Sequence, residues 1–386
     1  MFYFVTYFIH SLFTIGVARA DDMTTIHVCR FFAGVFAGPS LVLIEGTFAD
    51  IWSAETTNTY YALLGCASYI GAALSPLVCG YVVMARDWRW SQYVALMIDL
   101  AILLFASGMP ETYQREIPRR EARRRGEKLE QPLAESGVTI GQMLKTTVFD
   151  PVIMVATEPI VMLSTLHLLW NWAALFQWFI TVPTVLNMVY GWTLRMAGLA
   201  FSSAIIGSVL AVATSVAIEQ FLYRRHVRSG STTPLALELR LLPALIGAPL
   251  MPASLFWVGW TAEPTTNMYV PITGTGVYVY GSLLCVISIV PYLFDAYPPA
   301  GTLSALTIAA VMRILLGATI PLVILQAFTN ITGAWALSAL GFVGFALMPA
   351  PFLLFLFGKR FREHSPFSKR LTIHGPRAGD IDGELK

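Results

Sequence analysis

The chain contains 386 residues, of which 56% are hydrophobic and only 12% are charged. Ordinary soluble domains carry about 25% charged residues, so the composition excludes a soluble globular protein and indicates an all-α polytopic membrane protein. The net charge of +2 comes without a basic patch interleaved with aromatic residues, so nucleic acid is not an expected partner. The four cysteines lie in apolar segments without metal-ligand spacing, and neither a metal nor another cofactor is expected.

Ten apolar segments are long enough to cross a bilayer, which takes about 20 helical residues. A long polar segment separates the fourth from the fifth. The expected spans cover residues 2–17, 25–48, 60–84, 93–109, 160–186, 197–223, 241–260, 269–294, 302–326 and 334–357. The expected domains are an incomplete N-terminal bundle of four helices at 1–112, a basic cytoplasmic loop at 113–156, a six-helix bundle at 157–358 and a cytoplasmic tail at 359–386.

The distribution of lysine and arginine predicts the orientation of these spans. Most of the 25 basic residues lie in the long polar segment, in the loop between the sixth and seventh spans, and in the C-terminal tail. An even number of spans separates these regions, so all three fall on one side, which the positive-inside rule makes cytoplasmic. Arg30 and Arg313 differ from the others because they lie within spans.

The second expected span carries charge at membrane depth. Arg30, Gly34, Gly38, Leu41 and Glu45 recur at spacings of three and four, so they share roughly one helical face. Because such a charge costs at least ~2.5–3.5 kcal/mol, we predict that this face lines a transport path. Arg30 would act as a fixed charge on a nearby carboxylate, and Glu45 would exchange a proton. The alternatives are an arginine that reaches the outer interface and a glutamate satisfied near the cytoplasmic end.

Two aspartates occupy matching places in the two halves. Asp50 and Asp295 end the second and eighth spans, and the same number of residues separates them as separates Pro76 from Pro321. This shared spacing suggests a duplicated bundle. We predict that both aspartates gate the cytoplasmic side by pairing with loop arginines, the alternative being ordinary solvated helix ends. Glu158, which opens the second half, is either part of the same interface or a surface residue.

Several short segments carry a family resemblance over roughly residues 1–360. They are RFFAGVFAGPS at 30–40, GTFADIWS at 46–53, GAALSPLVCGYV at 71–82, DWRW at 87–90, PETY at 110–113 and YLFDAYP at 292–298. In kind and order they resemble the fungal major facilitator superfamily, specifically its drug:proton antiporter group, which includes polyamine transporters. The resemblance implies the major facilitator fold, with two pseudo-symmetric bundles. It also implies that about ten of the usual twelve helices are present and that the first two are missing.

The third span resembles the antiporter motif GPxxGPxxGG of that family. Gly71, Pro76 and Gly80 match the motif, and with Pro321 of the ninth span they are the expected conformational switch between the halves. Small residues allow helices to approach closely, and proline removes a backbone donor and permits a bend. The alternative is a packing seam of small residues.

Polar and aromatic residues alternate in the fifth span. We predict that Asn171, Gln177 and Trp178 line a pocket for a flat, amphipathic or cationic ligand; the alternative is a set of interhelical hydrogen bonds with lipid-facing rings. Asp99 is a further acidic residue inside a span, the fourth. Asn330 begins an Asn-Ile-Thr acceptor, which is a weak glycosylation candidate because it lies very close to two spans.

These features together predict a monomeric secondary active transporter of the plasma membrane or the vacuolar membrane. It would export a small organic compound, such as a drug, toxin, secondary metabolite or polyamine, in exchange for protons, by alternating access. Its other partners would be membrane lipids. The sequence contains neither the GxxxxGK[ST] loop of an ATP-driven pump nor an HxxxxD, HExxH or GxSxG motif that would indicate an enzyme. The alternative is a truncated, non-transporting relic or a membrane scaffold.

Overall fold

The computed structural model describes residues 2–51, 57–108, 125, 149–228, 237–297, 310–320, 322–323, 326–327 and 331–365. Every regular element within these ranges is helical. In chain order they are α1 (Phe2–Arg19), α2 (Met23–Ile51), α3 (Thr57–Ala85), α4 (Arg89–Ser107), α7 (Asp150–Thr157), α8 (Pro159–Tyr190), α9 (Leu194–Ala200), α10 (Ser202–Arg228), η2 (Leu237–Leu241), α11 (Leu242–Thr261), α12 (Tyr269–Ala296), α14 (Gly333–Leu347) and α15 (Pro349–His364). A further apolar helix covers Ala310–Ile320.

The positions of the helices confirm the expected all-α polytopic fold. Seven helical segments of the described chain are long and apolar enough to cross a membrane. The expected spans 160–186 and 269–294 become α8 and α12; α8 is longer at both ends, and α12 extends two residues further at its C-terminal end. The expected span 302–326 is helical over 310–320, and its remaining residues lie largely outside the described ranges. Apolar length therefore located α8 and α12, whereas the first and ninth expected spans correspond to the shorter apolar helices Phe4–Arg19 and Ala310–Ile320.

The chain divides into two compact units. The first comprises Met1–Tyr61, Leu74–Val138 and Trp192–Leu199, and the second comprises Ala62–Ala73, Thr139–Gly191 and Ala200–Lys386. The division follows packing rather than chain order. The middle of α3 belongs to the second unit, whereas the end of α3 and most of α9 belong to the first.

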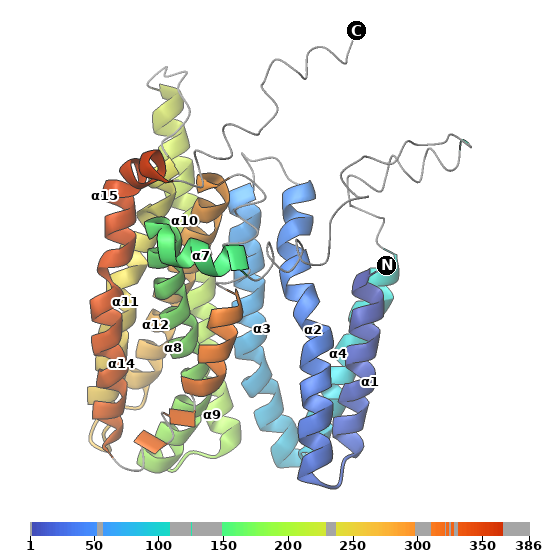
Figure 1. Cartoon of the computed structure of the whole chain (residues 1–386). Coiled ribbons are helices and arrows are strands. Elements are labelled where there is room, and N and C mark those ends of the chain that lie inside the picture. The colour runs from blue at the N-terminus through green and yellow to red at the C-terminus, as the bar shows by residue number, and fades with distance from the viewer. Residues whose placement is uncertain are drawn as a thin grey trace. The chain divides into compact units, whose positions relative to one another are not determined.

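In the first unit, α1 packs against α2 and α4, and the three helices run side by side in Figure 1. The ring of Phe13 stacks on Phe32, with centroids 5.2 Å apart, which fills the seam between α1 and α2. At one end of the unit, the Arg89 guanidinium donates to the carbonyl of Ala20 and to the carboxylate of Asp21, each over 3.0 Å. Arg89 thereby ties the α1–α2 loop to the start of α4.

In the second unit, α12 forms the centre, because α8, α10 and α11 all pack against it (Figure 1). Glycines set the distances between α12 and its neighbouring helices. Cβ atoms built at Gly276 and Gly281 would lie 2.8 Å from the backbone oxygens of Ser203 in α10 and Gly247 in α11. Close approach of small residues is how helices associate in a membrane, where apolar side chains gain little by leaving lipid.

The ends of α8 follow from its sequence. Pro159 occupies the first helical position, where its missing N–H costs no hydrogen bond. Gly191 follows the last residue with φ of 65°, a left-handed conformation that glycine adopts without strain. The helix between them is 32 residues long, and α8 carries the polar residues from which a site can be built.

Candidate functional site

Asn171 of α8 is fully buried and joins three helices of the second unit. Its amide Nδ2 donates to the Ser282 carbonyl over 3.2 Å, and the Ser282 hydroxyl donates to Asn171 Oδ1 over 2.5 Å. The hydroxyl of Tyr69, from α3, lies 2.8 Å from Ser282 Oγ, and the Tyr278 hydroxyl donates to the Asn171 carbonyl over 2.9 Å. The structure thus commits the Asn171 amide to bonds between helices, which was the alternative to a ligand-binding role.

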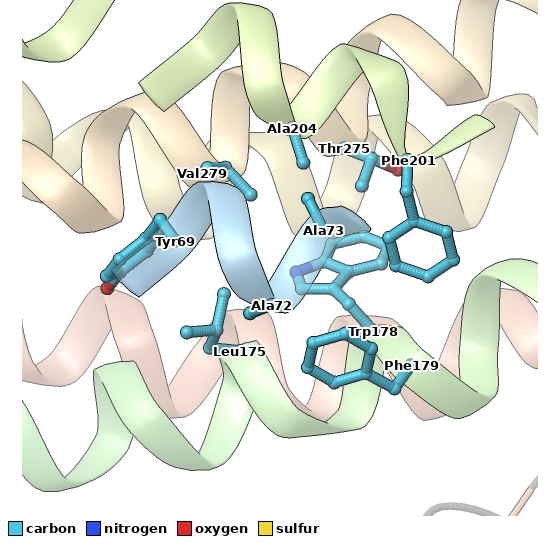
Figure 2. A pocket seen from close by; sticks show the side chains of 10 residues that line it. All are labelled: Tyr69, Ala72, Ala73, Leu175, Trp178, Phe179, Phe201, Ala204, Thr275 and Val279. Atoms are coloured by element: carbon cyan, nitrogen blue, oxygen red, sulfur yellow. The ribbon is translucent and has the colours of Figure 1, made fainter. Parts of the chain in front are cut away.

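Trp178, two turns further along α8, does line a pocket (Figure 2). The hollow is small, with about 20 Å³ open to the centre of a water-sized sphere, and lies within the second unit. Phe179 and Leu175 come from the same helix, and Phe201 comes from α10. The remaining wall is made of small or aliphatic side chains and one ring: Tyr69, Ala72 and Ala73 of α3, Ala204 of α10, and Thr275 and Val279 of α12. The pocket is apolar and aromatic.

Two donors at this level of α8 lack a partner. The indole Nε1 of Trp178 and the amide Nε2 of Gln177 are buried, and neither forms a hydrogen bond to another described residue. The Gln177 oxygen is satisfied, since the Thr181 hydroxyl donates to it over 2.9 Å. A buried unpaired donor is costly, so these two groups are available to a polar ligand atom. Of the three predicted pocket residues, only Trp178 borders the hollow itself.

The first unit contains a buried acidic residue at mid-helix. Asp99 of α4 is 8% exposed. The Tyr7 hydroxyl donates to one carboxylate oxygen over 2.7 Å, and the His10 Nε2 lies 3.8 Å from the other. His10 Nδ1 lies 3.0 Å from the Ala33 carbonyl of α2; because a carbonyl only accepts, this nitrogen is the donor. Tyrosine, histidine and aspartate thus form one polar cluster between α1 and α4.

The charged face predicted in α2 is described only in part. Arg30 is an exposed residue of α2, and no ion pair or hydrogen bond joins it to another described residue. Glu45 and Asp50 lie within α2, Asp50 one residue before its end, and their side chains are outside the described part of the structure. A partnership between Arg30 and Glu45 therefore remains a prediction.

The expected switch residues differ in their packing. A Cβ built at Gly80 would lie 2.9 Å from the Leu194 carbonyl of α9, and one at Gly198 of α9 would lie 2.7 Å from the Pro76 carbonyl. The end of α3 and α9 therefore cross in close contact. Gly71 has no described atom within 4 Å of such a Cβ and lies on an exposed side of α3, so its role in a switch stays a prediction. Pro321, and likewise Asn330, lies outside the described residues.

Asp295, one residue before the end of α12, forms an ion pair with Arg240 of η2. Next to it, Arg362 of α15 donates to the Tyr292 hydroxyl over 3.1 Å and forms an ion pair with Glu238 at 2.5 Å. Residues of η2 and of the end of α15 thus lie beside the end of α12. The sequence predicted that Asp295 pairs with a loop arginine, as it does with Arg240. The gating role of Asp295 stays a prediction.

Glu158 is a buried residue rather than a surface one, with 1% exposure. It lies at the break between α7 and α8. The Tyr297 hydroxyl donates to its carboxylate over 3.1 Å, and the Ser365 hydroxyl donates over 2.8 Å. Burial and the adjacent Glu158 charge raise the pKa of Tyr297 above its ordinary value, so this hydroxyl remains a donor. The sequence offered no sign of these partners because they lie far along the chain.

Comparison with known proteins identifies the family. Residues 1–321 match the Major Facilitator Superfamily. The chain is also 34% identical over 365 residues to the MFS-type transporter traF of Penicillium crustosum, a match that covers 94% of this chain and 74% of that protein. The chain belongs to the Major Facilitator Superfamily. The efflux pump FUB11 of Gibberella moniliformis is 28% identical over 368 residues, covering 93% of the chain and 61% of that protein.

Solved structures show the same fold. The proton:xylose symporter XylE superposes with a TM-score of 0.62 at 15% identity, over 92% of this chain and 79% of that one. At this identity the likeness concerns the fold alone. Membership in the Major Facilitator Superfamily makes the chain an integral, multi-pass membrane protein that acts in transport, and not an enzyme.

Proposed function

We propose that this Major Facilitator Superfamily protein exports a small organic compound across a membrane in exchange for protons. The observation that carries the proposal is the similarity, along more than nine-tenths of the chain, to fungal transporters that include an efflux pump. Export and proton exchange also follow from the earlier resemblance to drug:proton antiporters. The host membrane would be the plasma membrane or the vacuolar membrane, and the protein would act as a monomer.

The lining of the pocket beside Trp178 supports the proposal that the substrate is apolar or aromatic. Its lining offers the rings of Trp178, Phe179 and Phe201 for stacking, and few polar atoms. Ligand pockets of this kind bind by apolar contact and use a small number of polar groups for orientation. The unpaired indole Nε1 of Trp178 would supply one such group.

Proton exchange requires a group that gains and loses a proton inside the membrane. Among the described residues, we assign this role to Asp99 with Tyr7 and His10, and the burial and hydrogen bonding of the carboxylate within the first unit support the assignment. Neutralising a buried charge changes the free-energy difference between two conformations. Protonation of this site, acting with the proposed charges at Arg30, Glu45, Asp50 and Asp295, would thereby shift the protein between its two open states.

Purified protein in sealed liposomes provides the test. With an imposed pH gradient, we expect uphill movement of flat aromatic probes, abolished by a protonophore. Trp178→Ala should weaken transport of these probes at least several-fold, whereas Trp257→Ala, on an exposed part of α11, should not. A correctly folded preparation that moves no probe in either direction would favour the alternative of a non-transporting scaffold and would overturn the proposal.

A further inference from the structure

Arg313 lies over an indole ring inside the second unit. Its guanidinium carbon is 5.1 Å from the centroid of Trp172 in α8. Within the described part of the chain, no carboxylate forms an ion pair with Arg313 and no hydrogen bond reaches its guanidinium. The cation–π contact contributes about 0.5–2 kcal/mol, which does not offset a charge that costs at least ~2.5–3.5 kcal/mol at membrane depth.

A glycine in the same helix brings this charge against α8. A Cβ built at Gly317 would lie 2.7 Å from the ring of Phe176. Arg313 precedes Gly317 by four residues, and Trp172 precedes Phe176 by four. Residues four apart stack on one helical face, so the close approach at Gly317 and Phe176 places Arg313 over Trp172 one turn away.

The indole adds a second unused donor. Nε1 of Trp172 is buried and has no hydrogen-bond partner among the described residues. The guanidinium covers the face of this ring, and the N–H lies at its edge. Tyr69 packs on the same indole with centroids 6.0 Å apart, and Phe176 packs at 5.9 Å. A positive charge, an unpaired N–H and three aromatic rings are thus gathered in one place.

We infer that Arg313 and Trp172 bind the carboxylate of an aromatic organic acid, which names the substrate class of the proposed transporter and rests on that proposed function. The planar guanidinium matches a carboxylate through two parallel N–H donors, and the indole N–H supplies a third. The rings of Tyr69 and Phe176 provide apolar surface beside the charge. The bound anion replaces the counter-charge that Arg313 lacks among the described residues.

The depth of the site favours a substrate over a lipid headgroup. Trp172 is thirteen residues from the start of α8 and eighteen from its end. At 1.5 Å per residue it lies roughly 20 Å and 27 Å from the two ends of the helix. Lipid phosphates occupy the interfaces of a hydrocarbon core ~30 Å thick, and their headgroups do not reach this level.

Binding in nanodiscs of zwitterionic lipid tests the inference without any gradient. We expect naphthalene-2-carboxylate to bind at least ten-fold more tightly than its neutral isostere, 2-naphthamide, by titration calorimetry. Arg313→Gln should remove this preference and leave amide binding unchanged, and Arg313→Lys should retain part of it. Trp172→Phe, which keeps the ring but removes the N–H, should weaken carboxylate binding about three- to ten-fold. Arg195→Gln is the matched control, since Arg195 makes a similar cation–π contact with Tyr81 in the first unit.

Equal affinity for acid and amide, or an unchanged preference in a folded Arg313→Gln protein, would overturn the inference. If Arg313→Gln fails to fold, Arg313→Lys and Trp172→Phe provide the test instead. Competition by phosphatidylglycerol would instead assign the site to a lipid phosphate and would also overturn it. The two proposals can fail separately. Binding of the acid without any transport contradicts the proposed transport function. Transport of neutral aromatic probes without a preference for binding the acid contradicts only the carboxylate site at Arg313.

Discussion

The Asp99 carboxylate of α4 accepts a 2.7 Å hydrogen bond from the Tyr7 hydroxyl of α1. A second group of α1, His10 Nε2, approaches the same carboxylate to 3.8 Å. Since His10 Nδ1 is held by a backbone carbonyl, its Nε2 is the nitrogen that faces Asp99. One proton added to this group of three changes the net charge inside the first unit.

Asp99→Asn removes the charge but keeps the shape and the hydrogen-bond acceptor for Tyr7. We expect gradient-driven transport to fall at least ten-fold, whereas downhill exchange of substrate persists because it needs no net proton movement. Glu263→Gln, in an exposed loop, is the control and should behave as the unmodified protein. Paired assays in liposomes with and without a pH gradient measure the effect, and full gradient-driven transport by Asp99→Asn would exclude Asp99 as the coupling group.

Asn171→Ala should destabilise the second unit, because the hydroxyls of Ser282 and Tyr69 lose their place in a buried network. The expected cost is about 1–2 kcal/mol, the range of hydrogen bonds between membrane helices. Thermal unfolding in detergent measures it, and Thr319→Ala, on an exposed helix face, is the control. Lost substrate binding at unchanged stability would instead support the predicted pocket role of Asn171.

Gly198→Ala and Gly71→Ala form a matched pair. The first places a methyl group 2.7 Å from the Pro76 carbonyl, and the second meets no described atom within 4 Å. Crowding of this kind costs about 1–3 kcal/mol, so Gly198→Ala should lower the unfolding temperature or slow transport, and Gly71→Ala should do neither. If Gly71→Ala is the harmful variant, Gly71 is packed in a conformation other than this one, as the switch prediction requires.

Exchange of the two charges between Arg240 and Asp295 tests the proposed gate. Each side chain is about a quarter exposed, so the pair should contribute only about 1 kcal/mol to stability. We expect Arg240→Asp and Asp295→Arg each to impair transport several-fold and the double variant to recover most of it. Single variants that transport normally would limit this pair to a structural role.

The sequence was sufficient to predict the spans but not the neighbours of individual polar side chains. Apolar length determines where a helix can cross a membrane, which is why α8 and α12 lie where they were expected. Asn171 illustrates the limit. Its position on α8 fitted both a pocket and an interhelical bond, and the sequence does not show that Ser282 and Tyr69 lie next to it.

Other groups of the candidate site depend on contacts over long distances in the sequence. Trp178 was predicted to line a substrate pocket; it borders a hollow, and its role in binding a substrate stays a prediction. The contribution of Phe201 and Val279 to its walls could not be predicted, because it depends on which faces of α10 and α12 meet α8. The effect of Gly317 on Arg313 could not be predicted either, because it requires the ring of Phe176 beside it.

The burial of Glu158 has a consequence for the order of events during synthesis. Tyr297 follows it by 139 residues and Ser365 by 207. At ~5–20 residues per second, roughly 10–40 s pass before the ribosome has added Ser365. Until then one of the two hydroxyl groups that donate to the carboxylate at the start of α8 is missing, so this contact is complete only after α15 has been translated.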